Sequence, residues 1–249
     1  MTTIAEDHWL VTRAVAHRGY HKGREVPENS LASFQAAIDR GLPIELDVQL
    51  MGDQTALVFH DKTTTRLCGE DYSVKILSEP ARKRLRLYET DEFIPTLQEV
   101  LEFVNEQVPI LLEIKSDTKD FLIESAVSKA LLNYKGEVAI QSFNPYSLMW
   151  LRENHPHLLL GLLGMRPEHY KISKFMDQVL GNYLMSPQVQ PDFYGYDMND
   201  IDHPMVQFWR VTRKVPLLAW TVRSDQDWEK IRHCVDNIIF ENIDLNYKG

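Results

Sequence analysis

Short apolar runs alternate with longer stretches of helical periodicity along almost the whole chain. In parallel α/β proteins each short run is a buried strand, and the amphipathic stretch after it is a helix that crosses back over the sheet. Eight runs have the composition of strands, at residues 14–17, 44–48, 110–115, 138–143, 158–163, 193–198, 217–222 and 237–241. Eight strands with helices between them predict an α/β chain that closes into a single (β/α)8 TIM barrel rather than an open sheet.

Helical periodicity fills the intervals between these runs. The stretch 31–40 stops at Gly41, and the stretch 96–107 follows Pro95, which are ordinary stop and start signals for a helix. The other predicted helices cover residues 120–134, 146–154, 168–180, 204–214 and 225–234. A length of 249 residues is usual for one barrel, so we predict a single domain over residues 1–249.

Two stretches interrupt the alternation. Residues 51–54 (Met-Gly-Asp-Gln) have turn composition and predict a hairpin that brings His60 back towards the end of the second strand, with arms at residues 47–50 and 56–59. Residues 61–94 form a short charged insertion after this hairpin, with a basic run at residues 82–86. We expect the insertion to be a loop that covers the substrate cleft and tunes substrate choice.

The charge balance disfavours polyanionic partners. The chain has 36 acidic and 27 basic residues and a formal net charge of −9, so its overall field repels nucleic acid. A small anionic substrate is compatible with this charge, because local cations or a bound metal reverse the potential within one cleft. The first residues lack the pattern of a secretory signal, no apolar run could span a membrane, and only two cysteines occur. We therefore expect a reduced cytoplasmic protein, and the sequence leaves homo-oligomerisation open.

Carboxylates stand at the ends of two predicted strands, where active sites of this fold class lie. Side chains alternate across a strand, so Glu45 and Asp47 share one face of the second strand, and Glu113 and Lys115 share one face of the third. An isolated Glu-x-Asp pair is more often a solvated edge or an internal ion pair, but the repetition on a second strand favours a site. Because three carboxylates in one low-dielectric mouth repel one another unless a cation neutralises them, we predict that Glu45, Asp47 and Glu113 bind a divalent ion, Mg²⁺ or Ca²⁺.

Two histidines are candidates for proton transfer. His17 ends the first predicted strand and is followed by Arg18 and Gly19, and His60 follows the returning arm of the hairpin. Imidazole is the side chain whose ordinary pKa lies nearest neutral pH, although a lone histidine is more often structural. Arg18 and Lys115 could compensate the charge on phosphoryl oxygens, or form salt bridges with the carboxylates, and the two roles can coexist.

Further polar residues at strand ends are candidates for substrate contact. Glu28 and Asn29 lie in the loop after the first strand, where Asn29 or Ser30 is expected to cap the following helix. Glu28 could contact either metal or substrate. Gln141 ends the fourth strand, and Trp220 ends the seventh, where it could pack in the core or form a wall of the substrate site.

In chain order these residues resemble the glycerophosphodiester phosphodiesterase family. The resemblance is carried by several short motifs: His17-Arg18-Gly19, Pro27-Glu28-Asn29-Ser30, Glu45-Leu46-Asp47-Val48, Val58-Phe59-His60-Asp61, Pro95-Thr96-Leu97, Leu112-Glu113-Ile114-Lys115, Gln141-Ser142-Phe143 and Trp220-Thr221-Val222. It departs from the family's usual ending after the last strand, at Phe240-Glu241-Asn242. The resemblance implies a metal-binding barrel, with the insertion typical of the family at residues 61–94.

The resemblance also implies residue roles and a reaction. Glu45, Asp47 and Glu113 would hold the metal, His17 and His60 would act as acid and base, and Arg18 and Lys115 would support the phosphate of a glycerophosphodiester that is converted to sn-glycerol 3-phosphate and an alcohol. The competing hypotheses are a related phosphodiesterase or phospholipase, a non-catalytic phosphodiester-binding barrel, and another metal-dependent barrel enzyme. A phospholipase would need an apolar rim or a secretion signal, and a non-catalytic barrel would have a broken cluster.

Overall fold

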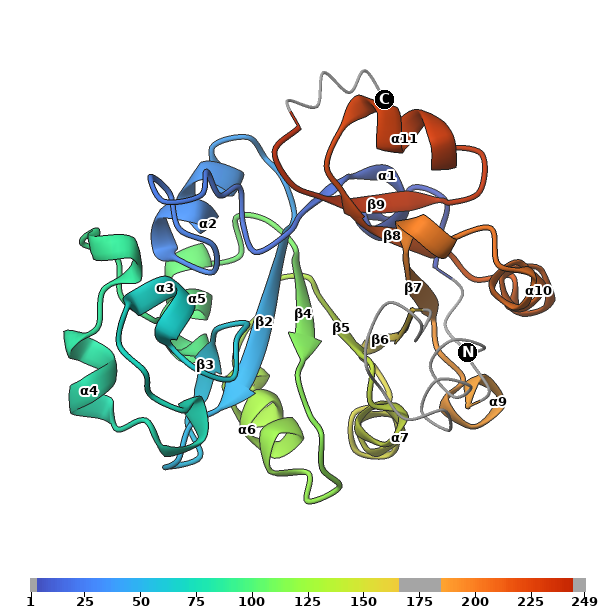
Figure 1. Ribbon diagram of the computed structural model, residues 1–249. Helices are drawn as coiled ribbons and strands as arrows, with labels where there is room; N and C mark the ends of the chain where they lie inside the picture. Colours follow the sequence, from blue (N-terminus) through green and yellow to red (C-terminus); the bar gives the residue numbers. More distant parts are fainter. Residues whose placement is uncertain (1–3, 166–184, 244–249) are drawn as a thin grey trace. The chain divides into compact units, whose positions relative to one another are not determined.

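The computed structural model describes residues 4–165 and 185–243 (Figure 1). The chain forms two compact units: Ala16–Val138, here called the first unit, and Met1–Val15 with Ala139–Gly249, here called the second unit. Strands that pair in parallel alternate with helices along the described residues, which confirms the predicted α/β class and (β/α)8 barrel. The assignment of residues 1–249 to one domain stays a prediction.

The first unit is organised around β2 (Ile44–Leu50). On one side Ala16 of β1 (Val15–Ala16) pairs with Ile44, and on the other side β4 (Ile110–Ile114) pairs in parallel with β2. The far end of β2 continues into a hairpin with the antiparallel strand β3 (Ala56–Val58), as the sequence predicted. The connecting helices of this unit are α2 (Leu31–Ile38), α5 (Leu97–Val104) and α6 (Leu122–Leu131) (Figure 1).

Helix α2 begins at a cap built from two serines. Ser30 is the N-cap residue, its side chain accepts a hydrogen bond from Ser33 N, and the Ser33 side chain accepts one from Ser30 N. This exchange satisfies two of the backbone donors that a helix start leaves without partners. Of the two cap candidates in the sequence, Ser30 therefore takes the role, and the neighbouring residue Asn29 is left for other contacts.

Residues 61–94 form a folded layer rather than the expected loop. The segment contains α3 (Thr65–Cys68), η1 (Val74–Ile76), α4 (Glu79–Arg84) and η2 (Leu87–Glu89). Its apolar side chains pack with those of the β2–β3 hairpin in one buried cluster: Met51, Leu57, Phe59, Leu67, Val74, Leu77, Leu85, Leu87 and Ile94. The sequence prediction failed here because each apolar stretch is too short for helical periodicity to emerge.

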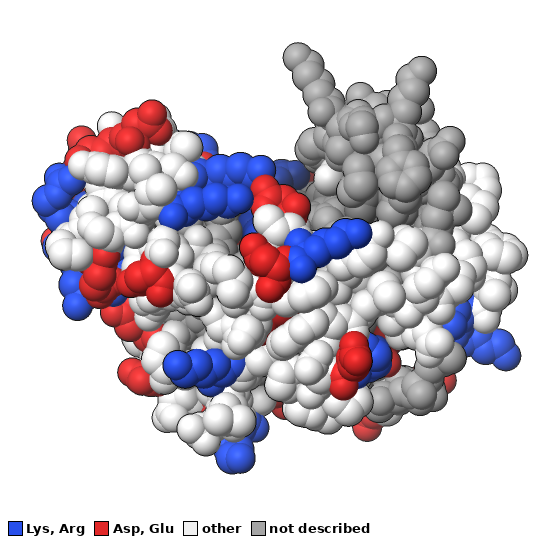
Figure 2. Space-filling view, turned by 90° about the horizontal axis from the view of Figure 1, so that it is seen from below, with Lys and Arg blue, Asp and Glu red and all other residues white. Residues whose placement is uncertain are grey.

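The basic run within the insertion is paired with its own surroundings. Arg82 is 1% exposed and donates hydrogen bonds to Glu79, to Glu99 and to the carbonyl of Ile94. Arg84 is bound bidentately by a glutamate, and Arg86 donates to three backbone carbonyls of its own helix end. These pairings engage the arginines of the run within the protein, and the role of the run in substrate choice stays a prediction. On the face drawn in Figure 2, basic side chains likewise lie beside acidic ones.

The second unit carries the remaining strands in sequence order. The strands from β5 to β9 pair in parallel, each with the next along the chain. Asn237 of β9 donates hydrogen bonds to the carbonyls of Leu10 and Arg13, and these bonds fix α1 (Trp9–Thr12) to β9. The strands are β5 (Val138–Ser142), β6 (Leu159–Gly164), β7 (Phe193–Asp197), β8 (Leu217–Val222) and β9 (Asn237–Phe240). The other elements are α7 (Pro145–Asn154), α9 (Ser186–Val189), η4 (Met198–Asp200), α10 (Pro204–Arg213) and α11 (Asp225–Ile231).

Strand positions in both units follow the sequence prediction to within a residue or two, and the predicted helices are present but mostly shorter. The predicted helix at residues 168–180 lies outside the described residues. Helices α1, α3, α4 and α9, none longer than six residues, were not predicted. No described helix is both long and apolar enough to span a bilayer.

Candidate active site

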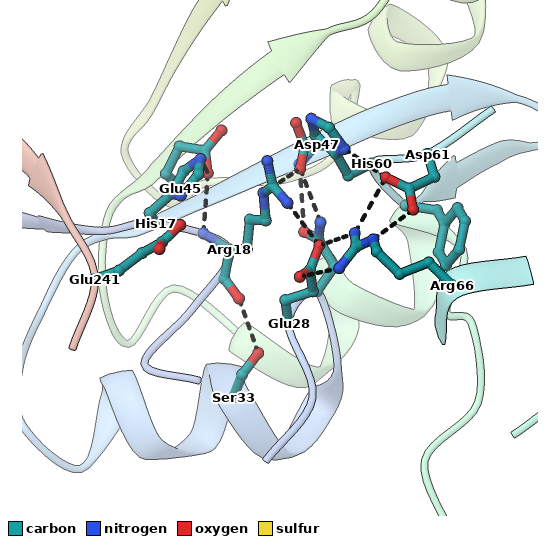
Figure 3. Close-up of polar contacts among 12 residues, drawn as sticks. His17, Arg18, Glu28, Ser33, Glu45, Asp47, His60, Asp61, Arg66 and Glu241 are labelled. Atoms are coloured by element: carbon teal, nitrogen blue, oxygen red, sulfur yellow. Dashed lines mark hydrogen bonds and ion pairs between the residues drawn. The ribbon is translucent and has the colours of Figure 1, made fainter. Parts of the chain in front are cut away.

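A tight turn after β1 places the first group of site residues. Arg18 and Gly19 both have positive φ, 54° and 79°. A Cβ atom on Gly19 would lie 2.4 Å from Ser33 Oγ and 2.8 Å from the backbone carbon of Ser33, so only glycine fits between the turn and α2. The turn directs Arg18 N to Glu45 Oε2 at 2.9 Å, and Ser33 Oγ donates to the carbonyl of Arg18 at 3.0 Å (Figure 3).

The predicted metal ligands come together at the paired ends of β2 and β4. Asp47 is in register with Glu113, and one carboxylate oxygen from each of Glu45, Asp47 and Glu113 lies within 4.8 Å of the others. All three residues are buried, and Glu45 Oε1 has no hydrogen-bond partner among the described residues. Burial raises the pKa of Glu45 well above its usual value, and repulsion from Asp47 and Glu113 raises it further. Glu45 Oε1 is therefore the oxygen of the cluster at which a cation or a hydrogen-bond donor is missing among the described residues.

Two cations contact the carboxylates of Asp47 and Glu113, but they do not satisfy every oxygen of the cluster. Lys115 Nζ is 2.8 Å from Glu113 Oε1 and 3.0 Å from Asp47 Oδ1, and Arg18 Nε is 3.2 Å from Asp47 Oδ2. Burial opposes ionisation of Asp47, but Lys115 and Arg18 outweigh it and hold the pKa of this carboxyl far below its usual value. Burial likewise acts against the charge on Lys115, yet Asp47 and Glu113 raise its pKa above the usual value.

The loop before α2 supports both the carboxylates and the cations. Asn29 is buried with φ of 54°, and its Nδ2 donates to Asp47 Oδ2 at 2.9 Å, while Asp47 N donates to Asn29 Oδ1 at 3.3 Å. Glu28 Oε1 accepts a hydrogen bond from Arg18 Nη1 at 2.6 Å. Both side chains predicted to contact substrate therefore position other site residues in this structure.

His17 lies directly beside the carboxylate cluster. Its Nε2 is 3.8 Å from Glu45 Oε2, and the residue is 8% exposed. The side chain belongs to the same turn as Arg18, so the backbone conformation that presents Arg18 N to Glu45 also places the imidazole. A protonated imidazole here would add a third positive charge next to the buried carboxylates.

The hairpin returns His60 to the level of Asp47, as the sequence predicted. Phe59 N donates to the carbonyl of Asp47 at 2.9 Å, and Gln49 Nε2 donates to the carbonyls of Phe59 and Asp61 at 2.8 and 2.7 Å. His60 Nδ1 is 2.7 Å from Asp61 Oδ1 (Figure 3). A proton on Nδ1 satisfies this contact, which leaves Nε2 of His60 for proton transfer.

The sequence analysis named Asp61 only as part of a motif and did not name Arg66, and both contact the candidate site residues. Arg66, on α3 of the insertion, bridges Asp61 and Glu28 (Figure 3). The adjacent pair His60-Asp61 was a usable signal, because a carboxylate beside a histidine commonly fixes its tautomer. Arg66 had no such signal, since its partners are set by the fold of the insertion.

Gln141 and Trp220, the remaining predicted contact residues, belong to the second unit. Gln141 is 2% exposed on β5, Trp220 is on β8, and a Cβ atom on Gly195 of β7 would lie within 3.7 Å of both side chains. Gln141 Oε1 and Trp220 Nε1 are buried and have no hydrogen-bond partner among the described residues. Phe143 packs edge-on against Trp220, with ring centroids 5.6 Å apart.

Comparison with known proteins places these residues in one family. The sequence model described as the Glycerophosphoryl diester phosphodiesterase family matches residues 17–245. A glycerophosphodiester phosphodiesterase of Caldanaerobacter subterraneus subsp. tengcongensis is 33% identical, and the match covers 96% of this chain and 100% of that protein. Human glycerophosphodiester phosphodiesterase 1 is 36% identical over 41% of this chain and 33% of its own length.

Solved structures share the fold. The glycerophosphodiester phosphodiesterase of Thermotoga maritima is 26% identical with a TM-score of 0.70, and the match covers 92% of this chain and 94% of that one. A phosphodiesterase of Oleispira antarctica, solved in complex with the product sn-glycerol-3-phosphate, is 21% identical with a TM-score of 0.76 and covers 93% of both chains.

Proposed function

Because the chain belongs to the glycerophosphoryl diester phosphodiesterase family, we propose that it hydrolyses glycerophosphodiesters to sn-glycerol 3-phosphate and an alcohol. The observation that carries this proposal is the buried group of Glu45, Asp47 and Glu113, in which Glu45 Oε1 has no hydrogen-bond partner among the described residues. His17 lies beside Glu45, and the hairpin returns the backbone next to His60 to Asp47. All of these residues lie in the first unit.

The residues fit a hard divalent cation. Glu45, Asp47 and Glu113 offer oxygen ligands only, and Glu45 Oε1 is a buried acceptor with no donor among the described residues. Oxygen ligands of this kind suit Mg²⁺ or Ca²⁺ rather than zinc. When bound, such an ion withdraws electron density from a phosphoryl group and lowers the pKa of a neighbouring hydroxyl.

His17 and His60 would carry the protons. The oxygen of the glycerol hydroxyl next to the phosphoester attacks phosphorus and passes its proton to one histidine. The other histidine protonates the oxygen of the departing alcohol as its bond to phosphorus breaks. The product of this step is a cyclic glycerol phosphate, which water opens with the two roles reversed. Direct attack by water on the diester is the competing route.

Arg18 and Lys115 would balance the charge of the phosphoryl oxygens. Both cations are held against Asp47, so their positions are set before a substrate arrives. Gln141 and Trp220, which belong to the second unit, stay predicted substrate contacts; Gln141 Oε1 and Trp220 Nε1 are buried and have no hydrogen-bond partner among the described residues. Glu28 and Asn29 would act on the substrate mainly by holding Arg18 and Asp47.

The expected partner is a small molecule. The net charge of −9 disfavours nucleic acid, and we retain a reduced cytoplasmic location as part of the proposal, supported by the free cysteines Cys68 and Cys234. The sequence leaves homo-oligomerisation open, and light scattering would measure it.

Hydrolysis of glycerophosphocholine tests the proposed function. We expect release of choline and sn-glycerol 3-phosphate with Mg²⁺ or Ca²⁺ present, loss of activity with a chelator, and recovery when the metal is returned. Turnover that survives exhaustive chelation would contradict the metal requirement. Failure to turn over a panel of glycerophosphodiesters with either metal would contradict the substrate class.

A further inference from the structure

One arginine of the insertion contacts both sides of the candidate site. Arg66 Nε and Nη2 donate to Asp61 Oδ2 and Oδ1 at 2.6 and 3.1 Å. On its other edge, Nη1 and Nη2 donate to Glu28 Oε2 and Oε1 at 2.8 and 2.8 Å. Both edges of the planar guanidinium are therefore used in bidentate contacts, a geometry that arginine provides and lysine does not (Figure 3).

Each carboxylate that Arg66 holds also holds a residue assigned to chemistry. Asp61 Oδ1 accepts from both Arg66 and His60 Nδ1, and Glu28 Oε1 accepts from both Arg66 and Arg18 Nη1. The contacts form a chain from His60 to Arg18 in which Arg66 is the central link. Its removal would leave both carboxylates free to rotate away from the groups they orient.

We propose that Arg66 is a positioning residue that fixes the tautomer of His60 through Asp61 and the orientation of the Arg18 side chain through Glu28. The proposal rests on the proposed function, because His60 and Arg18 matter only if they act on a phosphodiester. It also gives the insertion a role other than substrate choice, because α3 carries the arginine that holds Asp61 and Glu28.

A second contact supports this task for the insertion. Glu92 Oε2 accepts a hydrogen bond from Ala32 N in the first turn of α2, 3.2 Å away. Arg66 and Glu92 thus hold the segment of residues 28–33, which runs from the loop into the first turn of α2, at two points from opposite ends of the insertion. Leu67, next to Arg66, packs in the buried apolar cluster of the insertion and the hairpin.

A contribution to folding stability is expected beside the positioning role, because the Arg66 contacts are bidentate and its partners Glu28 and Asp61 are only 11% and 23% exposed. The Arg66 side chain itself is 43% exposed. Arg84 offers a matched comparison in the same insertion, because it is bound bidentately by Glu70 at 2.8 and 2.9 Å and its side chain is 56% exposed. It contacts none of the predicted site residues among its recorded partners.

The test compares Arg66→Ala and Arg66→Lys with Arg84→Ala. Turnover of glycerophosphocholine is measured together with the side-chain ¹H–¹⁵N spectrum of His60, assigned with His60→Ala, at about pH 8.5 where histidines are normally neutral. We expect kcat to fall about 10- to 100-fold in both Arg66 variants, as for other losses of supporting contacts. We also expect the Nδ1–H tautomer of His60 to give way to a mixture. Arg84→Ala should match the wild type in both readouts.

The outcomes separate the inference from the proposed function. Wild-type kcat in the Arg66 variants, or a lowered kcat with an unchanged His60 spectrum, would overturn the positioning role. So would an equal loss in Arg84→Ala. If the wild-type protein turns over no glycerophosphodiester, the proposed function fails, while the His60 spectra still test whether Arg66 fixes the tautomer. Arg66→Lys keeps the positive charge and serves as the folded variant if Arg66→Ala is unstable.

Discussion

The first unit contains two clusters of buried charge that differ in how completely they are paired. Around Arg82, five hydrogen bonds to Glu79, Glu99 and the carbonyl of Ile94 use every donor direction of the guanidinium. At the ends of β2 and β4, three carboxylates face Arg18 and Lys115, and one oxygen of Glu45 keeps no partner among the described residues.

This difference separates a structural cluster from a functional one. Leaving a buried acceptor unpaired costs about 1–3 kcal/mol, so a folded protein keeps such a group only where something else compensates it. In the Arg82 cluster compensation comes from the protein itself. For the carboxylate cluster the proposed function assigns this compensation to a divalent cation, which oxygen ligands of this kind suit.

The largest expected effect is the loss of the metal site. Glu113→Gln and Glu45→Gln each remove a charge with little change in shape, so we expect Mg²⁺ affinity to fall sharply and kcat to fall on the order of 10³-fold or more. Isothermal titration calorimetry and glycerophosphocholine turnover measure the two effects. Glu102→Gln, on the exposed face of α5, is the matched control and should resemble the wild type.

Substitution of either catalytic histidine candidate by alanine is expected to have the next largest effect, a loss of rate on the order of 10²–10⁴-fold. His17→Ala and His60→Ala should retain metal binding, because neither residue belongs to the carboxylate group. On a p-nitrophenyl diester, whose leaving group departs without a proton, the variant that lacks the general acid should recover much of its rate. If both variants respond alike to the leaving group, the division into acid and base is wrong.

Removal of Arg82 should affect stability rather than activity. Arg82→Leu removes the arginine from Glu79 and Glu99, but Lys83 still pairs with Glu79 and Thr96 N still donates to Glu99. Both glutamate side chains are also more than a third exposed, at 39% and 34%. We therefore expect a loss of about 2–3 kcal/mol in urea unfolding, less than for a fully buried pair. Turnover per folded molecule should stay within about threefold of the wild type, since Arg82 touches no site residue. A drop in kcat as large as that of Glu113→Gln would remove the contrast between the clusters.

The smallest expected effect concerns pH and the metal-free protein. Because burial and then Asp47 and Glu113 raise the pKa of Glu45 in the folded state, its ionisation costs stability as pH rises above about 4.3, the ordinary value for glutamate. Below that pH Glu45 is mostly protonated in both the folded and the unfolded state, so its ionisation no longer lowers the free energy of unfolding. With chelator, Glu45→Gln should therefore exceed the wild type in unfolding free energy by about 1–2 kcal/mol near pH 8, and the gap should shrink towards pH 4.

Asp47 does not obscure this measurement. Its pKa is lowered in the folded state, so its contribution is lost only as pH falls below the ordinary aspartate value of about 3.9. Between about pH 5 and 8 Asp47 is ionised in both states. Thermal unfolding of the wild type and Glu45→Gln at several pH values measures the difference in their unfolding free energies. A difference that stays constant between about pH 5 and 8 would contradict the raised pKa of Glu45.

The sequence alone determined the strand order and the identity of the clustered carboxylates. Buried parallel strands require continuous apolar runs, and carboxyl ends of parallel strands meet at one edge, so Glu45, Asp47 and Glu113 could be placed together from spacing alone. The return of His60 followed in the same way from the turn composition at residues 51–54.

Only the tertiary structure decided which charges are paired with one another. Arg66, Arg82 and Arg84 lie close together in sequence, yet one holds site carboxylates, one is buried in a structural cluster and one pairs at the surface. The same holds for Asn29, a cap candidate that instead fixes Asp47. Such pairings depend on side chains brought together from distant segments, and no local periodicity or propensity encodes that geometry.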